Sequence, residues 1–149
     1  MTFFDTSKYP RLRLSRLSDF MDRSVSRRFQ ACGFDITNRQ ENALRNLRMY
    51  GSMSQTSLAE YTGQDRNSLS RTLAILEKKG LVEKKSSLDD RRFCEVSITQ
   101  KGEEVHIELM KILEDWRNEV FGRIPPEELA AFIATSEKLM SILHELDEK

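Results

Sequence analysis

The chain has 149 residues, 38% apolar and 32% charged, and its 24 basic side chains balance 24 acidic ones. This length suffices for one domain with a buried core, and the mixture is too apolar for a disordered segment and too charged for a membrane protein. Two cysteines are too few for a disulfide scaffold and the first residues lack the apolar run of a signal peptide, so we expect a cytoplasmic protein.

The first third of the chain has the periodicity of two helices. Apolar residues recur at three- and four-residue steps from Leu14 to Phe29, which predicts a helix of about five turns that ends at Cys32-Gly33. Thr37 and Gln40 form a capping-box pattern, which predicts the start of a second helix. Its apolar side holds Ala43, Leu44 and Leu47, and Gly51 ends it.

Two shorter helices follow. Ser54 is a candidate N-cap for a helix that ends at Gly63, and Asp65 is a candidate N-cap for the next helix, which runs to Lys78-Lys79 before Gly80. Two short helices joined by a turn that contains glycine indicate a helix-turn-helix.

The pattern then changes to extended structure. Leu81-Val82 and residues 93–98, which alternate, predict a β-hairpin around the polar tip 84–92. Thr99 or the Lys101-Gly102 step leads into a long helix, and Pro125-Pro126 starts the last one, with Leu129, Phe132, Ile133, Met140, Leu143 and Leu146 on its apolar side. The expected fold is mainly helical with a small β-hairpin wing.

The second helix of the helix-turn-helix has two different faces. One side must face the core and holds Leu69, Thr72, Leu73 and Leu76. The opposite side is polar and basic, without an acid between Arg66 and Leu76, and holds Arg66, Asn67, Ser70, Arg71, Ala74 and Lys78. Asparagine can bond adenine, arginine can bond guanine, and small serine allows close approach, so this face fits duplex DNA. A simply solvated helix face remains the alternative.

The hairpin tip adds four cations, Lys84, Lys85, Arg91 and Arg92. Beside a recognition helix they would follow phosphates or enter the minor groove. The adjacent acids Asp89 and Asp90 would repel phosphate unless one of them orients an arginine by a hydrogen bond. A polar turn with self-compensating charges is the alternative.

The neutral total hides an asymmetry. Residues 1–102 carry 19 Lys and Arg against 12 Asp and Glu, whereas residues 103–149 carry 5 against 12. Such a split fits a polyanion-binding surface held apart from a segment with another role. Pairing of the acidic part with the basic part inside the fold would give the same numbers.

These segments together resemble the MarR family of winged helix-turn-helix regulators. The resemblance rests on Leu58-Ala59-Glu60, Asp65–Arg71, Leu76–Val82, Asp89–Arg92 and Ile98–Gly102. It implies a homodimer with interlocked N- and C-terminal helices that binds a pseudo-palindromic DNA operator. It also implies roles in DNA binding for Asn67, Ser68, Ser70 and Arg71 of the recognition helix and for Asp90, Arg91 and Arg92 of the wing. Arg66 is expected beside them, and Ser54, the cap of the first helix, near a phosphate.

The terminal helices support a dimer independently. They have apolar stripes but flank a small central domain, and a twofold-related copy is the commonest cover for such stripes. We therefore expect an N-terminal dimerisation helix in residues 1–34, the DNA-binding domain in 35–102 and C-terminal dimerisation helices in 103–149. Two recognition helices would then meet major grooves about 34 Å apart.

The expected function is a dimeric transcriptional regulator, a repressor released by a small aromatic or anionic ligand whose site the sequence does not locate. The alternatives are a regulator that responds to cysteine oxidation and a helical adaptor without DNA activity. Cys94 is expected to be buried and inert, and Cys32 is not at the position of a peroxide-sensing cysteine. His106 and His144 stand isolated, so no metal site is expected. The sequence has no nucleophile elbow, no phosphate-binding glycine loop and no histidine–acid pair at a telling spacing, so no enzyme and no cofactor are expected.

Overall fold

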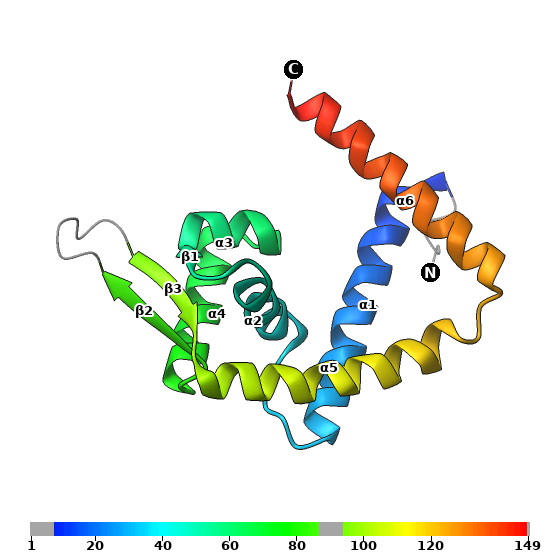
Figure 1. Ribbon diagram of the computed structural model, residues 1–149. Helices are drawn as coiled ribbons and strands as arrows, with labels where there is room; N and C mark the ends of the chain where they lie inside the picture. The colour runs from blue at the N-terminus through cyan, green and yellow to red at the C-terminus, as the bar shows by residue number, and fades with distance from the viewer. Residues whose placement is uncertain (1–7, 87–93, 149) are drawn as a thin grey trace, which may run out of the picture. The chain divides into compact units, whose positions relative to one another are not determined.

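The computed structural model describes residues 8–86 and 94–148. Its elements in chain order are α1 (Pro10–Ala31), α2 (Asn38–Tyr50), β1 (Met53–Ser54), α3 (Gln55–Thr62), α4 (Arg66–Lys78), β2 (Val82–Ser86), β3 (Cys94–Ile98), α5 (Gln100–Phe121) and α6 (Pro126–Asp147). The predicted order of helices and hairpin strands is confirmed, with β1 as an addition (Figure 1).

The strands form one antiparallel sheet in the order β1-β3-β2. The hairpin pairs Val82 with Ile98 at its base and Ser86 with Cys94 at its far end. β1 places Met53 opposite Val96, which makes β3 the central strand and leaves Val96 fully buried. Sequence periodicity did not predict β1 because a strand of two residues is too short to alternate.

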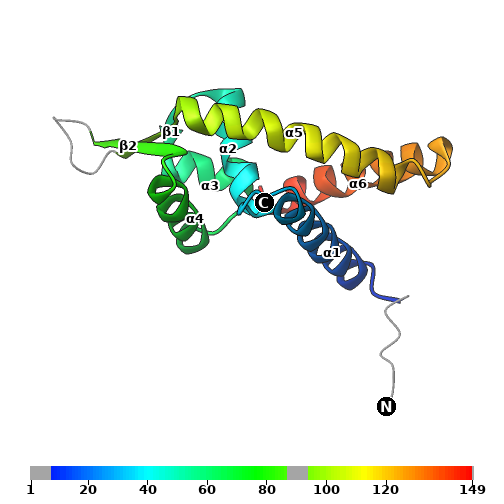
Figure 2. The ribbon, with the colours of Figure 1, turned by 90° about the horizontal axis from the view of Figure 1, so that it is seen from below.

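The helix-turn-helix packs against this sheet. Figures 1 and 2 show α2, α3 and α4 grouped together beside β3 and β2, and α1 reaches this group through α2. Their shared core is aliphatic and consists of Ala43, Leu44, Leu47, Leu58, Leu69, Leu73, Leu76, Leu81, Val82 and Val96. All the residues expected on the inner faces of α2 and α4 are therefore buried.

Local signals set the helix ends. The capping box of α2 is present, because the Gln40 backbone N–H donates to Thr37 Oγ1 at 3.2 Å and the Thr37 N–H donates to Gln40 Oε1 at 3.1 Å. At the start of α5, the Gly102 N–H donates to Thr99 Oγ1 at 3.0 Å. A methyl group at Gly102 would collide with the Leu81 carbonyl oxygen, so only glycine allows this approach.

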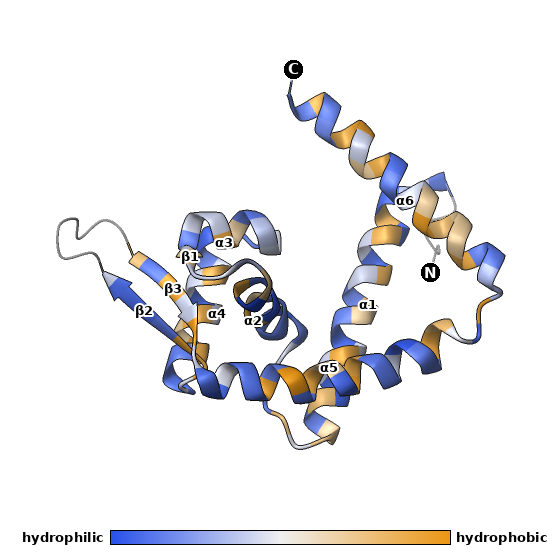
Figure 3. Ribbon diagram, viewed as in Figure 1, coloured by the Kyte–Doolittle hydropathy of each residue, from blue (hydrophilic) through white to orange (hydrophobic). Residues whose placement is uncertain are grey.

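The chain divides into two compact units, the first ending at Leu113 and the second beginning at Glu114. The second unit contains the end of α5, where the Trp116 and Phe121 rings meet edge to face with centroids 5.9 Å apart, and the whole of α6. No residue of α6 is buried. Of its expected inner side, Leu129 is half-buried, and the other residues, Phe132, Ile133, Met140, Leu143 and Leu146, are exposed in the single chain. Figure 3 shows apolar residues along its length.

α1 also changes character along its length. Val25 and Phe29 near its end are buried, whereas Leu14, Leu17 and Phe20 are 40–52% exposed. Two guanidinium groups lie over the Phe20 ring: the guanidinium carbons of Arg16 and Arg23 are 5.5 and 4.9 Å from its centroid. The predicted apolar stripe is therefore covered within the chain only at one end.

Candidate nucleic-acid interface

α4 is the predicted recognition helix, and its first turn is built by one side-chain cap. Asp65 accepts the Ser68 backbone N–H at 2.9 Å and the Ser68 hydroxyl at 2.6 Å. These two bonds hold the pKa of the Asp65 carboxyl below its usual range, because both stabilise the ionised form. Gly80 ends the helix with φ at +73°, a left-handed conformation that favours glycine.

The two faces of α4 separate as the sequence predicts. Leu69, Thr72, Leu73 and Leu76 are buried. The side chains of the opposite face are exposed and comprise Arg66, Asn67, Ser70, Arg71, Ala74 and Lys78. Ser68 is half-buried, and its hydroxyl proton is engaged by Asp65, so its remaining capacity toward a ligand is as an acceptor. Ile75, 43% exposed, adds an apolar side chain beside this face.

Ser54 is the N-cap of α3, as expected. Its hydroxyl oxygen accepts the Ser57 N–H at 3.1 Å, and Gly63 ends the helix in the left-handed region. Because β1 pairs with β3 immediately before this cap, the start of α3 is held against the sheet that carries the hairpin.

The predicted wing residues Asp90, Arg91 and Arg92 lie outside the described residues. The strand that precedes them, β2, contains charged residues. Lys84 lies 3.8 Å from Glu77 of α4, and Lys85 lies 3.3 Å from Glu83. The ion pair between β2 and α4 connects the hairpin to the recognition helix, although an exposed pair of this kind contributes little to stability.

The end of α4 is attached to two other elements. Lys79 Nζ contacts both the backbone oxygen and the carboxylate of Asp35, in the segment between α1 and α2. Lys101 Nζ donates to the Lys79 carbonyl at 2.9 Å, and Thr99 Oγ1 donates to the Gly80 carbonyl at 2.6 Å. These bonds to backbone oxygens position the helix rather than leave its orientation to packing alone.

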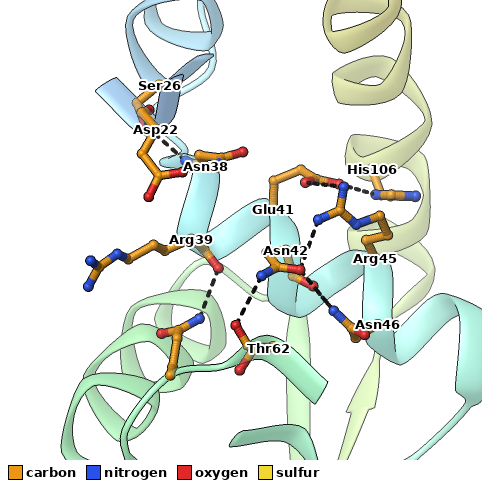
Figure 4. Close-up of polar contacts among 11 residues, drawn as sticks. Asp22, Ser26, Asn38, Arg39, Glu41, Asn42, Arg45, Asn46, Thr62 and His106 are labelled. Carbon is orange, nitrogen blue, oxygen red and sulfur yellow. Dashed lines mark hydrogen bonds and ion pairs between the residues drawn. The ribbon is translucent and has the colours of Figure 1, made fainter. Parts of the chain in front are cut away.

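A polar network at the start of α2 was not predicted from the sequence. Figure 4 shows Asp22 and Ser26 of α1 facing Asn38, whose side chain donates to Asp22 Oδ1 and whose backbone N–H donates to Ser26 Oγ at 2.9 Å. Asn42 donates to the Thr62 carbonyl at 3.4 Å, at the end of α3. A cavity of about 380 Å³ lies among these residues and the first turn of α4.

A buried acid–histidine pair also escaped the sequence analysis. Glu41 of α2 is fully buried, and its Oε1 lies 3.2 Å from Nδ1 of His106, which is 4% exposed (Figure 4). Arg45 lies 3.7 Å from the other carboxylate oxygen and is partly solvated. In the sequence, the sign of this pair is an acid, Glu41, three residues before Leu44 in a helix with an apolar side. That pattern does not identify His106 as its partner.

The cysteines differ from expectation at one site. Cys94 is half-buried rather than buried, and Cys32 is exposed at the end of α1. Among the described residues, no group of three or more His, Cys, Asp or Glu side chains could hold a metal ion. Within the same residues, no helix combines the length and the apolar character that a membrane crossing requires.

The Asp65 cap leads to a pH prediction. A lowered pKa in the folded protein means that the cap stabilises α4 above about pH 3.9, the ordinary aspartate pKa, and that this contribution is lost as the pH falls through the lowered value. In an NMR titration, the Ser68 amide should therefore shift with a midpoint below about 3.9. A midpoint at or above that value would contradict the assigned bonds, and Asp65→Asn should abolish the transition.

Comparison with known proteins agrees with this geometry. Residues 36–93 match the model of the MarR family. This winged helix-turn-helix segment is therefore of the MarR family. The chain is thus a DNA-binding transcriptional regulator, and the expectation that it is not an enzyme is confirmed by the nature of this family.

Solved structures extend the likeness beyond the matched segment. The transcriptional regulator PA4135 is 27% identical, with a TM-score of 0.74 over 89% of this chain and 98% of its own. A mutant MarR from E. coli, solved in complex with operator DNA, is 22% identical, with a TM-score of 0.80 over 93% and 99%. BpsR of Bordetella bronchiseptica, whose DNA binding is regulated by 6-hydroxynicotinic acid, is 20% identical, with a TM-score of 0.79 over 94% and 98%. At this identity the last two show the MarR fold alone.

Proposed function

We propose that this MarR-family protein is a homodimeric repressor that binds a pseudo-palindromic DNA site and is released by a small aromatic or anionic ligand. The observation that carries the proposal is the outer face of α4. It exposes Arg66, Asn67, Ser70 and Arg71 with no acid among them, while the opposite face is buried. An ordinary solvated helix mixes acids and bases at i, i+4 spacing, which this face does not.

The chemistry of this face suits base contacts. Asn67 can donate to and accept from adenine, and Arg71 can donate twice to guanine. Ser70 is small enough for the helix backbone to approach the groove. The wing residues Asp90, Arg91 and Arg92 would add contacts in or beside the minor groove, with the acid orienting an arginine.

The exposed faces of the terminal helices support a homodimer. α1 carries six arginines and two aspartates, whereas α6 carries five acids and one lysine. Each helix also exposes large apolar side chains, such as Phe20 on α1 and Leu143 on α6. In a homodimer, the second copy would bury the exposed apolar side chains of both helices and place opposite charges beside them. In a monomer these side chains remain in contact with water.

Ligand control is the part of the proposal that rests on likeness. BpsR, which has the same fold, is regulated by an aromatic acid. The chain offers cationic groups that would accept such an anion.

The first test is selection of bound DNA from random duplexes, repeated with phenolic acids present. We expect an enriched sequence with twofold symmetry and its loss with an active ligand. A protein that enriches no sequence and binds no duplex in dilute salt would overturn the proposal, since phosphate contacts alone give measurable affinity there.

The second test separates base contacts from phosphate contacts. Asn67→Ala should cost about 1–3 kcal/mol on the selected site and relax its base preference. Arg91→Ala should instead weaken binding to all duplexes and reduce the salt slope by about one. Fluorescence anisotropy at several salt concentrations measures both effects. Undiminished affinity of the double variant for the selected site would refute these assignments.

A further inference from the structure

Gln64, in the turn between α3 and α4, bonds two elements that lie far apart in sequence. Its Nε2 donates to the Arg39 carbonyl at 3.3 Å, in the first turn of α2, and its Oε1 accepts the Thr72 hydroxyl at 3.1 Å, on the inner face of α4. The amide orientation follows from chemistry, because a backbone carbonyl can only accept and therefore faces the NH2 group.

The two partners of Gln64 lie in the recognition helix and in a part of α2 that is bonded to α1. Thr72 is buried and lies one helical turn after Ser68, whereas Asn67 and Arg71 are exposed. Arg39 follows Asn38, which is bonded to Asp22 and Ser26 of α1. Hydrogen bonds therefore connect α1 to Asn38 and the Arg39 carbonyl to Gln64 and Thr72, and the peptide backbone between Asn38 and Arg39 links the two sets.

We propose that Gln64 is a positioning residue for DNA recognition, which sets the orientation of α4 on α2 by holding Thr72. It touches no base itself. The bonds at Lys79 and Gly80 hold the end of α4. Nearer its start, packing of Leu69 and Leu73 resists separation of the helices, but apolar contacts are not directional and permit rotation or sliding. The two hydrogen bonds are directional, and a base contact tolerates little displacement of the recognition helix.

The proposal rests on the DNA-binding function proposed above, and it predicts a loss of discrimination rather than of binding. A helix that is free to rotate still presents its cations to phosphates, so affinity for random duplex should persist. Contacts with base edges require the fixed orientation, so affinity for the selected site should fall.

The test measures the ratio of affinities for the selected site and a scrambled duplex in the full-length protein. Gln64→Met keeps the length of the side chain without its hydrogen bonds, and Thr72→Val keeps the shape without the hydroxyl. Each variant should lower this ratio about fivefold, which corresponds to the free energy of one hydrogen bond. The affinity for random duplex and its salt slope should not change. The double variant should be no worse than either single one.

Two controls distinguish positioning from general loss of stability. Thr72→Ser keeps the hydroxyl and should keep the ratio. Thr62→Val removes a hydroxyl that donates to Leu58 of its own helix at 2.7 Å, and it should leave the ratio unchanged. An unaltered ratio in Gln64→Met, or an equal fall in Thr62→Val, would overturn the inference. Failure of the wild-type protein to bind any duplex would instead refute the proposed function.

Discussion

Replacement of His106 with leucine is expected to lower the free energy of unfolding by about 3–5 kcal/mol. Glu41 is fully buried, and His106 Nδ1 lies closer to its carboxylate than the Arg45 guanidinium does, at 3.2 Å. Arg45 lies farther away, at 3.7 Å, and its side chain is 41% exposed. Removal of the imidazole would leave a carboxylate in the core with one distant, solvated partner, and an unpaired buried charge is far more costly than a missing pair.

Urea unfolding at fixed protein concentration measures this effect, and the concentration must match because self-association adds to apparent stability. His144→Leu is a matched control: its imidazole lies 3.1 Å from Glu148, but both side chains are exposed. It should change stability by less than about 1 kcal/mol. Adding Glu41→Leu to His106→Leu should restore much of the loss, since an apolar pair leaves no charge unpaired. A loss below about 1 kcal/mol in the single variant would contradict a stabilising contact between Glu41 and His106.

Leu143→Asp is expected to dissociate the proposed dimer and thereby to abolish tight operator binding. Leu143 is 59% exposed within the single chain, so the change does not disturb a core of the monomer. In a dimer that covers the apolar side of α6, the new carboxylate would be buried without a partner, twice per dimer. A cost of several kcal/mol corresponds to weakening of self-association by at least about a hundredfold.

Sedimentation velocity at micromolar concentration measures the oligomeric state, and anisotropy with the selected DNA site measures the consequence. Ala134→Asp introduces the same charge on the opposite side of α6, where Ala134 is exposed, and it should leave the dimer intact. A dimer that persists in Leu143→Asp, or a wild-type protein that sediments as a monomer, would contradict this arrangement.

The two effects also separate the roles of the two parts of the chain. The Glu41–His106 pair joins α2 to the first turns of α5 inside the unit that contains the helix-turn-helix. Its loss should reduce stability and leave the oligomeric state of the folded fraction unchanged. Leu143→Asp should instead change the oligomeric state, and its apparent stability should fall only by the contribution of self-association. Measurement of both properties on both variants therefore tests whether stability and self-association depend on different residues.

Much of the DNA-binding unit could be predicted because its signals are local. The Thr37–Gln40 capping box, the Asp65 cap and the stop at Gly80 each depend on residues within four positions of one another. The division of α4 into a buried and an exposed face follows from the 3.6-residue period alone. These features can be predicted without knowledge of the tertiary structure, and the structure contains all of them.

Local patterns were therefore sufficient to predict the helices, the hairpin and the exposed face of α4. Contacts between distant parts of the chain appear only in the folded protein: Glu41 meets His106, Gln64 meets Arg39 and Thr72, and β1 pairs with β3. The physical reason is that periodicity records which side of an element is buried, but not which distant side chain lies against it. A buried acid in a helix predicts a partner, and only the packing of α5 on α2 supplies His106.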